Sequence, residues 1–198
     1  MAVVAFLDTC VLFPANLRDV LLTAAEAGLY HVRWSPDVLD EMERNLTKKA
    51  QVIPPNAARL RDTMERAFPD AMTPRSAYAY LVPSMPNQEK DRHVLAAAIA
   101  SRSDVLVTAN VRDFQLPMNN GAVEVLHPDP FLCCQLDVAC APLLMALSRL
   151  ASQRRPPMNS LDTLLTSLVK TVPHFASRAA RAATGTDAES TPLTSSPP

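Results

Sequence analysis

Short runs rich in apolar residues alternate with longer amphipathic stretches through the first two thirds of the chain. Four of the short runs predict buried strands: residues 2–7, 30–34, 104–108 and 124–126. Four of the longer stretches repeat apolar residues at helical spacing and predict helices: residues 16–27, 35–49, 54–68 and 89–102. Strands that alternate with helices in this way predict an α/β fold, in which helices wrap a parallel sheet.

The ends of these helices carry start and stop signals. Gly28 stops the first helix, and Ser35-Pro36 supplies a hydroxyl cap followed by proline at the first helical position. Pro54-Pro55 opens the next helix. Residues 77–82 fit either a strand or an irregular segment. Ligands of doubly wound sheets bind beyond the carboxyl ends of the strands, so function is expected there.

In the last third of the chain, helical patterns follow one another without strands between them. Residues 131–150 predict a long apolar helix, which the basic and proline-rich residues 154–157 end. Residues 159–170 repeat leucine at helical spacing, and residues 174–183 predict one more short helix. Residues 184–198 are rich in Ser, Thr and Pro, a composition that predicts disorder.

Composition narrows the class of protein. A chain of 198 residues, 48% of them apolar, with a formal net charge of −1 can bury a core but offers no strong overall attraction to nucleic acid. A local basic groove is compatible with that charge. The four cysteines form no CxxC pair and have no histidine at zinc-finger spacing, which favours reduced thiols. Neither a signal peptide nor a stretch of roughly 20 apolar residues is evident, so we expect a soluble, cytoplasmic protein without a membrane partner.

The strand at residues 2–7 ends directly on Asp8. This places a carboxylate at the rim of the sheet, beside the core, where an ionised group is costly unless a partner stabilises it. A basic side chain or a metal ion would serve, and the residues around Asp8 leave both open. Other carboxylates that converge on the same point would favour the metal.

Three further acids, Glu41, Asp91 and Asp113, lie at helix or strand ends, and each has a plainer explanation. Glu41 borders the apolar stripe of its helix, although acids near a helix N-terminus are favoured by the helix dipole whatever their function, and the other acids of that helix fit such a role better. Asp91 shares a face with the apolar residues of its helix, yet Asp is a common N-cap. Asp113 follows a strand, and it has capping-box spacing from Asn110.

Gathered at one point, these four carboxylates would repel one another strongly at neutral pH. A divalent cation held among them relieves that repulsion, and an all-oxygen donor set favours Mg²⁺ or Mn²⁺ over zinc. Mg²⁺ keeps several waters and commonly binds substrate phosphate, and such a water can attack phosphorus. A magnesium-dependent phosphatase fits less well, because it requires a second Asp where this chain has Cys10.

Four short motifs, taken in their order and spacing, carry a family resemblance. They are Phe6-Leu7-Asp8-Thr9-Cys10-Val11-Leu12, the stretch from Ser35-Pro36 through Glu41 to Leu46, Asp91-Arg92-His93-Val94-Leu95-Ala96-Ala97-Ala98, and Val107-Thr108-Ala109-Asn110 through Asp113-Phe114. Over about residues 2–127 the chain resembles the PIN domain family, and within it the VapC-type toxins of bacterial toxin–antitoxin pairs. The resemblance implies a PIN-like three-layer α/β/α fold around a central parallel sheet, followed here by a C-terminal helical extension.

The resemblance also implies an activity and a set of site residues. The activity is that of a Mg²⁺- or Mn²⁺-dependent endoribonuclease, which hydrolyses RNA phosphodiester bonds as the toxin of a type II toxin–antitoxin system. The acidic quartet would be Asp8, Glu41, Asp91 and Asp113, with Asp8, Asp91 and Asp113 as metal ligands. Thr9, Asn110 and Thr108 would orient ligands or water. Arg92 and Arg44 would meet RNA phosphate, although either could instead pair with a neighbouring acid, and for Arg44, three residues after Glu41, that pairing is favoured.

The implied partners are RNA and a small antitoxin protein, and the expected state is a homo-oligomer. We expect a nuclease domain at residues 1–128, a helical extension at 129–183 and a disordered tail at 184–198. The leucine stripe of the extension could pack on the domain, form a dimer or seat an antitoxin segment. The main alternative is a non-catalytic PIN-like domain that binds RNA or a protein without cutting.

Overall fold

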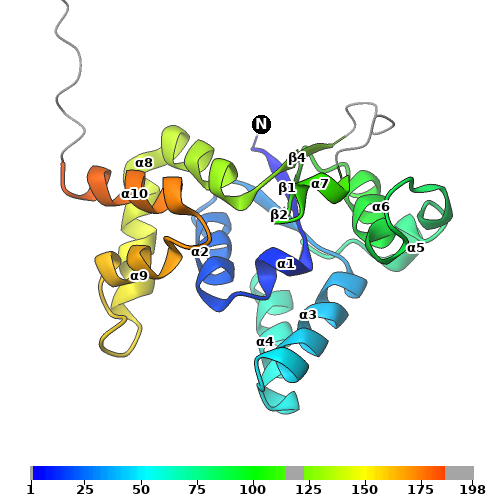
Figure 1. The fold of residues 1–198 in the computed structure, drawn as a ribbon, viewed down its shortest axis with the longest axis horizontal. Helices are drawn as coiled ribbons and strands as arrows, with labels where there is room; N and C mark the ends of the chain where they lie inside the picture. The colour runs from blue at the N-terminus through cyan, green and yellow to red at the C-terminus, as the bar shows by residue number, and fades with distance from the viewer. Residues whose placement is uncertain (1, 115–122, 186–198) are drawn as a thin grey trace, which may run out of the picture.

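A computed structural model describes residues 2–114 and 123–185. Within them lies a four-stranded sheet whose strands are all parallel and ordered β2-β1-β3-β4 (Figure 1). The strands are β1 (Val4–Leu7), β2 (His31–Arg33), β3 (Val105–Val107) and β4 (Glu124–Leu126). All four predicted strands are therefore confirmed. The disorder predicted for residues 184–198 falls almost wholly outside the described residues.

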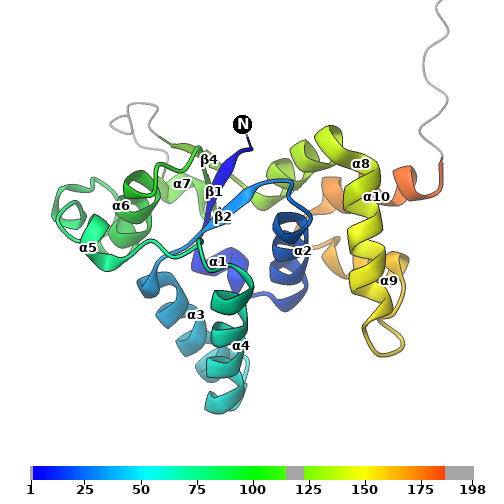
Figure 2. The same cartoon turned by 180° about the vertical axis from the view of Figure 1, so that it is seen from behind.

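Helices fill the connections between the strands. They are α1 (Thr9–Leu12), α2 (Ala15–Glu26), α3 (Pro36–Lys49), α4 (Pro54–Ala67), α5 (Arg75–Tyr78), α6 (Arg92–Ala100) and α7 (Val111–Phe114), with 3-10 turns η1 (Val82–Ser84) and η2 (Glu89–Asp91). Figures 1 and 2 show the sheet between α2 on one side and α5 and α6 on the other. The three-layer α/β/α architecture is thus present.

The capping signals act as the sequence predicts. Ser35 accepts a hydrogen bond from the Val38 amide at 3.3 Å at the start of α3, with Pro36 at the first helical position. Gly28, just past α2, has a φ of +77°, a backbone conformation that glycine adopts without steric cost. A strand at residues 77–82 is wrong, because α5 ends at Tyr78 and the 3-10 turn η1 begins at Val82. Pro83 lies inside that turn and would interrupt a strand ladder.

The register of the sheet brings two strand ends together. Leu7 of β1 pairs with Val107 of β3, and the next amide, that of Asp8, donates to the Val107 carbonyl at 3.1 Å. Both strands are buried at these positions, and the alanine-rich helix α6 packs beside them with Val94 through Ala98 buried. The residues that follow β1 and β3 are therefore held side by side, at the rim of a dry core.

The last described part of the chain is helical: α8 (Pro128–Ser152), α9 (Leu161–Leu168) and α10 (Pro173–Ala183). Helices α8 and α9 lie against α2, and Leu164, Leu165 and Leu168 of the predicted leucine stripe are buried (Figure 1). Of the three uses considered for that stripe, packing on the same chain is the one observed. The division of the chain at residue 128 remains a prediction.

Helix α8 bends at Ala139, whose φ of −147° and ψ of 56° are not helical, and Pro142 follows inside it. By length and composition this helix is long and apolar enough to cross a membrane, so the sequence expectation that no stretch would meet that test is wrong. The helix also carries a buried face, with 44% of its most apolar window covered inside the chain. Phe131, Leu132, Leu143 and Leu147 form that face, which is what a core helix requires.

Candidate functional site

Asp8 lies at the end of β1 and is only 7% exposed. Its Oδ2 atom accepts two hydrogen bonds, from the Thr108 hydroxyl at 2.7 Å and from the Cys10 thiol at 2.9 Å. Within the described residues no hydrogen bond is donated to its other oxygen, Oδ1. Asp8 stands at the N-cap position of α1 but does not cap it through its side chain. One oxygen is thus fixed by the protein and the other is left for a partner.

Cys10 and Thr108 connect Asp8 to the loop after β3. The Ala109 amide donates to the Cys10 sulfur at 3.1 Å, and the Asn110 amide donates to the Thr108 hydroxyl oxygen at 3.1 Å. Burial, followed by the charge and hydrogen bond of Asp8, raises the pKa of Cys10 to about 12. The thiol is therefore protonated at neutral pH and acts as a donor toward Asp8.

Glu41 joins this region through Thr9, whose hydroxyl lies 3.2 Å from the Glu41 Oε2 atom and 3.2 Å from the Val38 carbonyl oxygen. The other three acids of α3 are paired with cations: Asp37 with Arg75, and Asp40 and Glu43 with Arg61. Within the residues described, no Lys or Arg pairs with Glu41. Ion pairs therefore account for Asp37, Asp40 and Glu43 but not for Glu41, and of these acids only Asp37 lies in the first turn, where the helix dipole would favour it.

Asp91 occupies the N-cap position of α6, but its carboxylate makes no capping hydrogen bond. Its φ and ψ of −106° and −3° are not those of a typical N-cap, because the preceding 3-10 turn runs directly into the helix. The Asp91 Oδ2 atom is buried and has no hydrogen-bond partner. The capping explanation for this acid is therefore wrong.

The pKa of Asp91 is raised above its ordinary value. Burial is the largest cause, and the nearby charges of Asp8 and Asp113 act in the same direction, while Lys90 opposes them. Asp113 itself lies in the first turn of α7, where its amide donates to the Asn110 carbonyl at 3.0 Å. The structure thus places Asp8 and Asp113 each near enough to Asp91 to raise its pKa.

The only cation within 4.0 Å of any of these four carboxylates, among the described residues, belongs to Lys90. Its Nζ lies 3.6 Å from Asp91 Oδ2, beyond hydrogen-bond length, and its side chain is 66% exposed. Lys90 therefore sits at the rim and does not fill the space between the acids. In the described part of the chain, no three His, Cys, Asp or Glu side chains are already placed to coordinate one metal ion.

The two arginines predicted to meet RNA each donate from Nε to a backbone carbonyl. The Arg92 Nε atom donates to the Asn87 carbonyl at 3.1 Å, and the Arg44 Nε atom donates to the Asp40 carbonyl at 3.4 Å. Arg44 forms no ion pair with Glu41, so that alternative is wrong. The sequence also missed Cys10 and Lys90, although both adjoin a predicted acid, since neither residue type is by itself a sign of a metal site.

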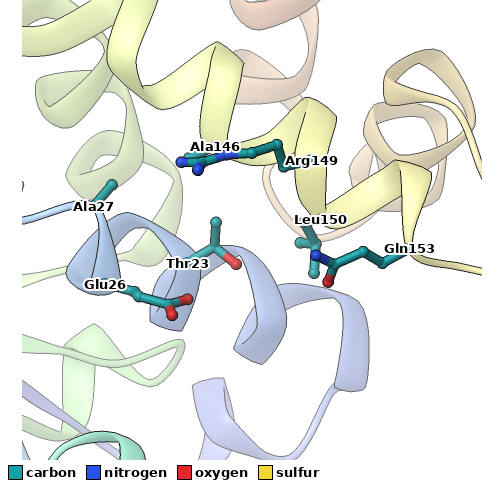
Figure 3. Close-up of a pocket in the computed structure, with 7 residues that line it drawn as sticks. All are labelled: Thr23, Glu26, Ala27, Ala146, Arg149, Leu150 and Gln153. Carbon is teal, nitrogen blue, oxygen red and sulfur yellow. The ribbon is translucent and has the colours of Figure 1, made fainter.

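A separate cavity of about 320 Å³ opens between α2 and α8. Figure 3 shows its seven lining residues, which are Thr23, Glu26, Ala27, Ala146, Arg149, Leu150 and Gln153. Helix α2 runs from the carboxyl end of β1 back toward the start of β2. Its last residue, Glu26, therefore lies near the amino ends of the strands, whereas Asp8 lies at a carboxyl end. None of the predicted site residues lines this cavity, so it is not part of the acidic site.

Comparison with known proteins agrees with the motifs. A family model described as "PIN domain" matches residues 4–112. The protein named "Putative ribonuclease VapC50" from Mycobacterium tuberculosis (strain ATCC 25618 / H37Rv) is 37% identical over 123 residues, which cover 60% of this chain and 72% of that protein. The family match includes three of the four acids and stops one residue before Asp113 and well before α8.

Proposed function

Because this chain belongs to the PIN domain family and is of VapC type, we propose that it is a metal-dependent endoribonuclease that hydrolyses phosphodiester bonds in RNA. A ribonuclease is what both comparisons support. The dependence on Mg²⁺ or Mn²⁺ and the position of the active site are our proposals. We assign the active site to Asp8, Glu41, Asp91 and Asp113.

The observation that carries the proposal is the buried Oδ2 atom of Asp91, which has no hydrogen-bond partner and only the exposed Lys90 at 3.6 Å, beside the charges of Asp8 and Asp113. A buried carboxylate oxygen without a hydrogen-bond donor is energetically costly. A divalent cation, which prefers oxygen ligands, would remove that cost by binding the oxygen. Asp8, Asp91 and Asp113 would hold such an ion, and Glu41 would complete the acidic site. When bound, Mg²⁺ or Mn²⁺ supplies charge neutralisation and an activated water.

The remaining residues would act by orientation. Thr108 fixes one oxygen of Asp8, and Thr9 fixes one oxygen of Glu41, so each carboxylate keeps one oxygen for the site. The free Glu41 Oε1 atom would accept a hydrogen bond from the water that attacks phosphorus. Asn110 would contact ligand or water from the loop after β3, and Lys90, Arg92 and Arg44 would supply positive charge to RNA phosphates.

For biological context we propose the toxin of a type II toxin–antitoxin pair, acting in the cytoplasm and bound by a small antitoxin protein. The support is the similarity to a VapC ribonuclease over 72% of its length. We further propose a nuclease domain at residues 1–128 with the helical extension at 129–183, and a homo-oligomer in solution.

A non-catalytic PIN-like binding protein is the second candidate. One observation supports it: in the described chain, no three acidic, His or Cys side chains are already placed to coordinate a metal ion. The net charge of −1 also gives RNA little overall attraction. Such a protein would bind RNA or a protein partner in the absence of divalent metal.

RNA cleavage by the purified chain, free of antitoxin, tests the proposal. We expect cleavage with Mg²⁺ or Mn²⁺, loss of cleavage with EDTA, and no cleavage by Asp8→Asn at an unchanged circular dichroism spectrum. Lys170→Ala, an exposed residue just after α9, is the matched surface control. If the wild-type chain cuts no RNA with either metal, or if cleavage persists in EDTA, the enzymatic proposal is wrong.

A further inference from the structure

Two hydrogen-bond donors, from the segments that follow β1 and β3, reach the same oxygen of Asp8. Thr108 follows β3, and Cys10 lies in α1, two residues after Asp8 itself. The thiol and hydroxyl lie 3.3 Å apart and could also bond to each other, but the charged Asp8 Oδ2, which can only accept, is the stronger acceptor for both protons. Oδ2 is therefore held at two points.

The backbone of the loop after β3 fixes the direction of both donors. Consecutive amides, those of Ala109 and Asn110, donate to the Cys10 sulfur and to the Thr108 oxygen at 3.1 Å each. Each amide thereby holds the sulfur or the hydroxyl oxygen in place beside Asp8. The sulfur thus bridges α1 to the loop that leads to Asp113.

We propose that Cys10 is a positioning residue of the nuclease site, whose thiol holds Asp8 Oδ2 so that Oδ1 faces the metal. This inference rests on the proposed function. A carboxylate free to rotate about its Cβ–Cγ bond loses that freedom when it binds an ion. If the carboxylate is already fixed before the ion binds, less rotational freedom is lost on binding. Residues that hydrogen-bond to metal ligands raise metal affinity in other proteins in this way.

The inference separates Cys10 from the other three cysteines. Cys134 and Cys140 are exposed on α8, and Cys133 is partly buried beside Arg178, whereas the Cys10 sulfur contacts three polar groups at the end of the sheet. Cys10→Ala removes the donor. Cys10→Ser keeps a donor in the same place, with a smaller atom. Cys134→Ala is the matched control for removal of a thiol.

Calorimetric titration of the intact chain with Mn²⁺ alone tests the inference without RNA. We expect Cys10→Ala to bind Mn²⁺ about 10- to 100-fold more weakly than wild type, as for other residues behind metal ligands. Cys10→Ser should recover most of that loss, and Cys134→Ala should match wild type. In RNA cleavage, the Mn²⁺ concentration for half-maximal rate should rise for Cys10→Ala, while the rate at saturating Mn²⁺ changes less.

The outcomes distinguish this inference from the function on which it rests. Wild-type affinity in Cys10→Ala, or a Cys10→Ser variant as weak as Cys10→Ala, would overturn the positioning role and leave the nuclease proposal intact. A wild-type chain that binds no Mn²⁺ overturns both. If Cys10→Ala fails to fold, Thr108→Val and Thr108→Ser take its place, because Thr108 donates to the same Asp8 oxygen. Equal Mn²⁺ affinity in those two variants would refute the two-donor arrangement.

Discussion

Two carboxylates, the partly buried Asp91 in the acidic site and the buried Asp129 at the start of α8, differ in how this fold satisfies them. Asp129 is 5% exposed, and both its oxygens are occupied: Oδ1 accepts from the Phe175 amide at 2.8 Å, and Oδ2 accepts from the His174 amide at 3.2 Å and lies 2.7 Å from the His174 ring. Asp91 has a buried oxygen with no hydrogen-bond partner. The first carboxylate joins α8 to α10, whereas the second has only a 3.6 Å ion pair with the exposed Lys90, its neighbour in sequence.

The pKa values of these two carboxyl groups are shifted in opposite directions, because their surroundings differ. Burial alone would raise the pKa of Asp129, but the hydrogen bonds from Phe175 and His174 outweigh it and hold the pKa below its usual range. At Asp91 burial and the charges of Asp8 and Asp113 raise the pKa, against a weaker opposing effect of Lys90. Carboxylates that stabilise a fold are surrounded by donors, whereas a group left unsatisfied beside like charges marks a functional site.

The same contrast extends to the two regions. Where the extension meets α2, Arg154 donates to Asn16 at 2.7 Å and to Asp19 at 2.5 Å, and Asn16 donates to Ser167 at 2.9 Å. That joint pairs opposite charges and matches donors with acceptors. The acidic site gathers like charges at the end of a dry sheet. Substitutions in the two regions should therefore separate activity from stability.

The largest expected effect is on catalysis. Asp91→Asn removes a proposed metal ligand and should lower RNA cleavage by at least about 100-fold, because a catalytic metal contributes several kcal/mol of charge stabilisation in the transition state. Asp129→Asn, the matched change in the extension, should leave the rate per folded molecule within about twofold. Both rates are measured at saturating Mn²⁺, with the folded fraction taken from circular dichroism. Equal losses in the two variants would erase the contrast between the regions.

The next effect is on stability. Asp129→Ala removes a charged acceptor that serves the first turn of α10, and it should lower the free energy of unfolding by about 2–3 kcal/mol, in the range for charged hydrogen bonds and lost caps. Urea unfolding followed by circular dichroism measures this. Asp137→Ala, which removes a more exposed partner of Arg178 in the same pair of helices, is the control and should cost less than about 1 kcal/mol. A larger loss from Asp137→Ala than from Asp129→Ala would contradict the role given to Asp129.

Acid should remove the contribution of Asp129. Since its folded pKa is lowered, the stabilisation is present above the unfolded Asp value of about 3.9 and disappears as the pH falls through the folded pKa. The difference in unfolding free energy between wild type and Asp129→Ala should therefore be full at neutral pH and shrink below about pH 4. Urea unfolding across that range measures it. A difference that is independent of pH would mean that packing, and not the ionised carboxylate, holds α10.

Local patterns were enough to predict the strands, most helices and the four acids, since a strand that ends on an acid and a helix that begins on one are visible in a few consecutive residues. Asp8, Glu41, Asp91 and Asp113 came from such signals. What the sequence could not show is which acids are already neutralised. The pattern separates Glu41 from Asp37 and Asp40 only by its place beside the apolar stripe, and the cations that pair with those two come from α5 and α4.

Long-range contacts account for the other misses. His174 meets Asp129, 45 residues away, a contact that no pattern of neighbouring residues predicts. Cys10 was treated as one of four ordinary thiols, and only the parallel pairing of β1 with β3 brings Thr108 and Ala109 to it. The bend of α8 at Ala139 and its packing on α2 likewise depend on the assembled core. Trp34, predicted to be core, is fully buried.

The smallest expected effect is also the one that most sharpens the comparison: Asp91→Asn should stabilise the metal-free protein. Because the pKa of Asp91 is raised in the folded state, the folded chain favours the protonated carboxyl, so the contribution of Asp91 to stability is fully present at low pH and is lost as the pH rises through that pKa. A neutral amide avoids this loss. At neutral pH the variant should melt slightly above wild type, by a few degrees at most, since 1 kcal/mol corresponds to about 2–4 °C for a chain of this size.

Two conditions should cancel that advantage, and they distinguish charge repulsion from improved packing. In acid, wild-type Asp91 becomes protonated and the two melting temperatures should converge. In Mn²⁺ at about 100 times its Kd, ligand binding should stabilise wild type by about 2.7 kcal/mol, and the variant, which lacks a ligand, by much less, so the order reverses. Differential scanning calorimetry of both proteins gives all three comparisons. If Asp91→Asn is less stable than wild type without metal at neutral pH, Asp91 is a structural carboxylate like Asp129, and the difference drawn between the two regions fails.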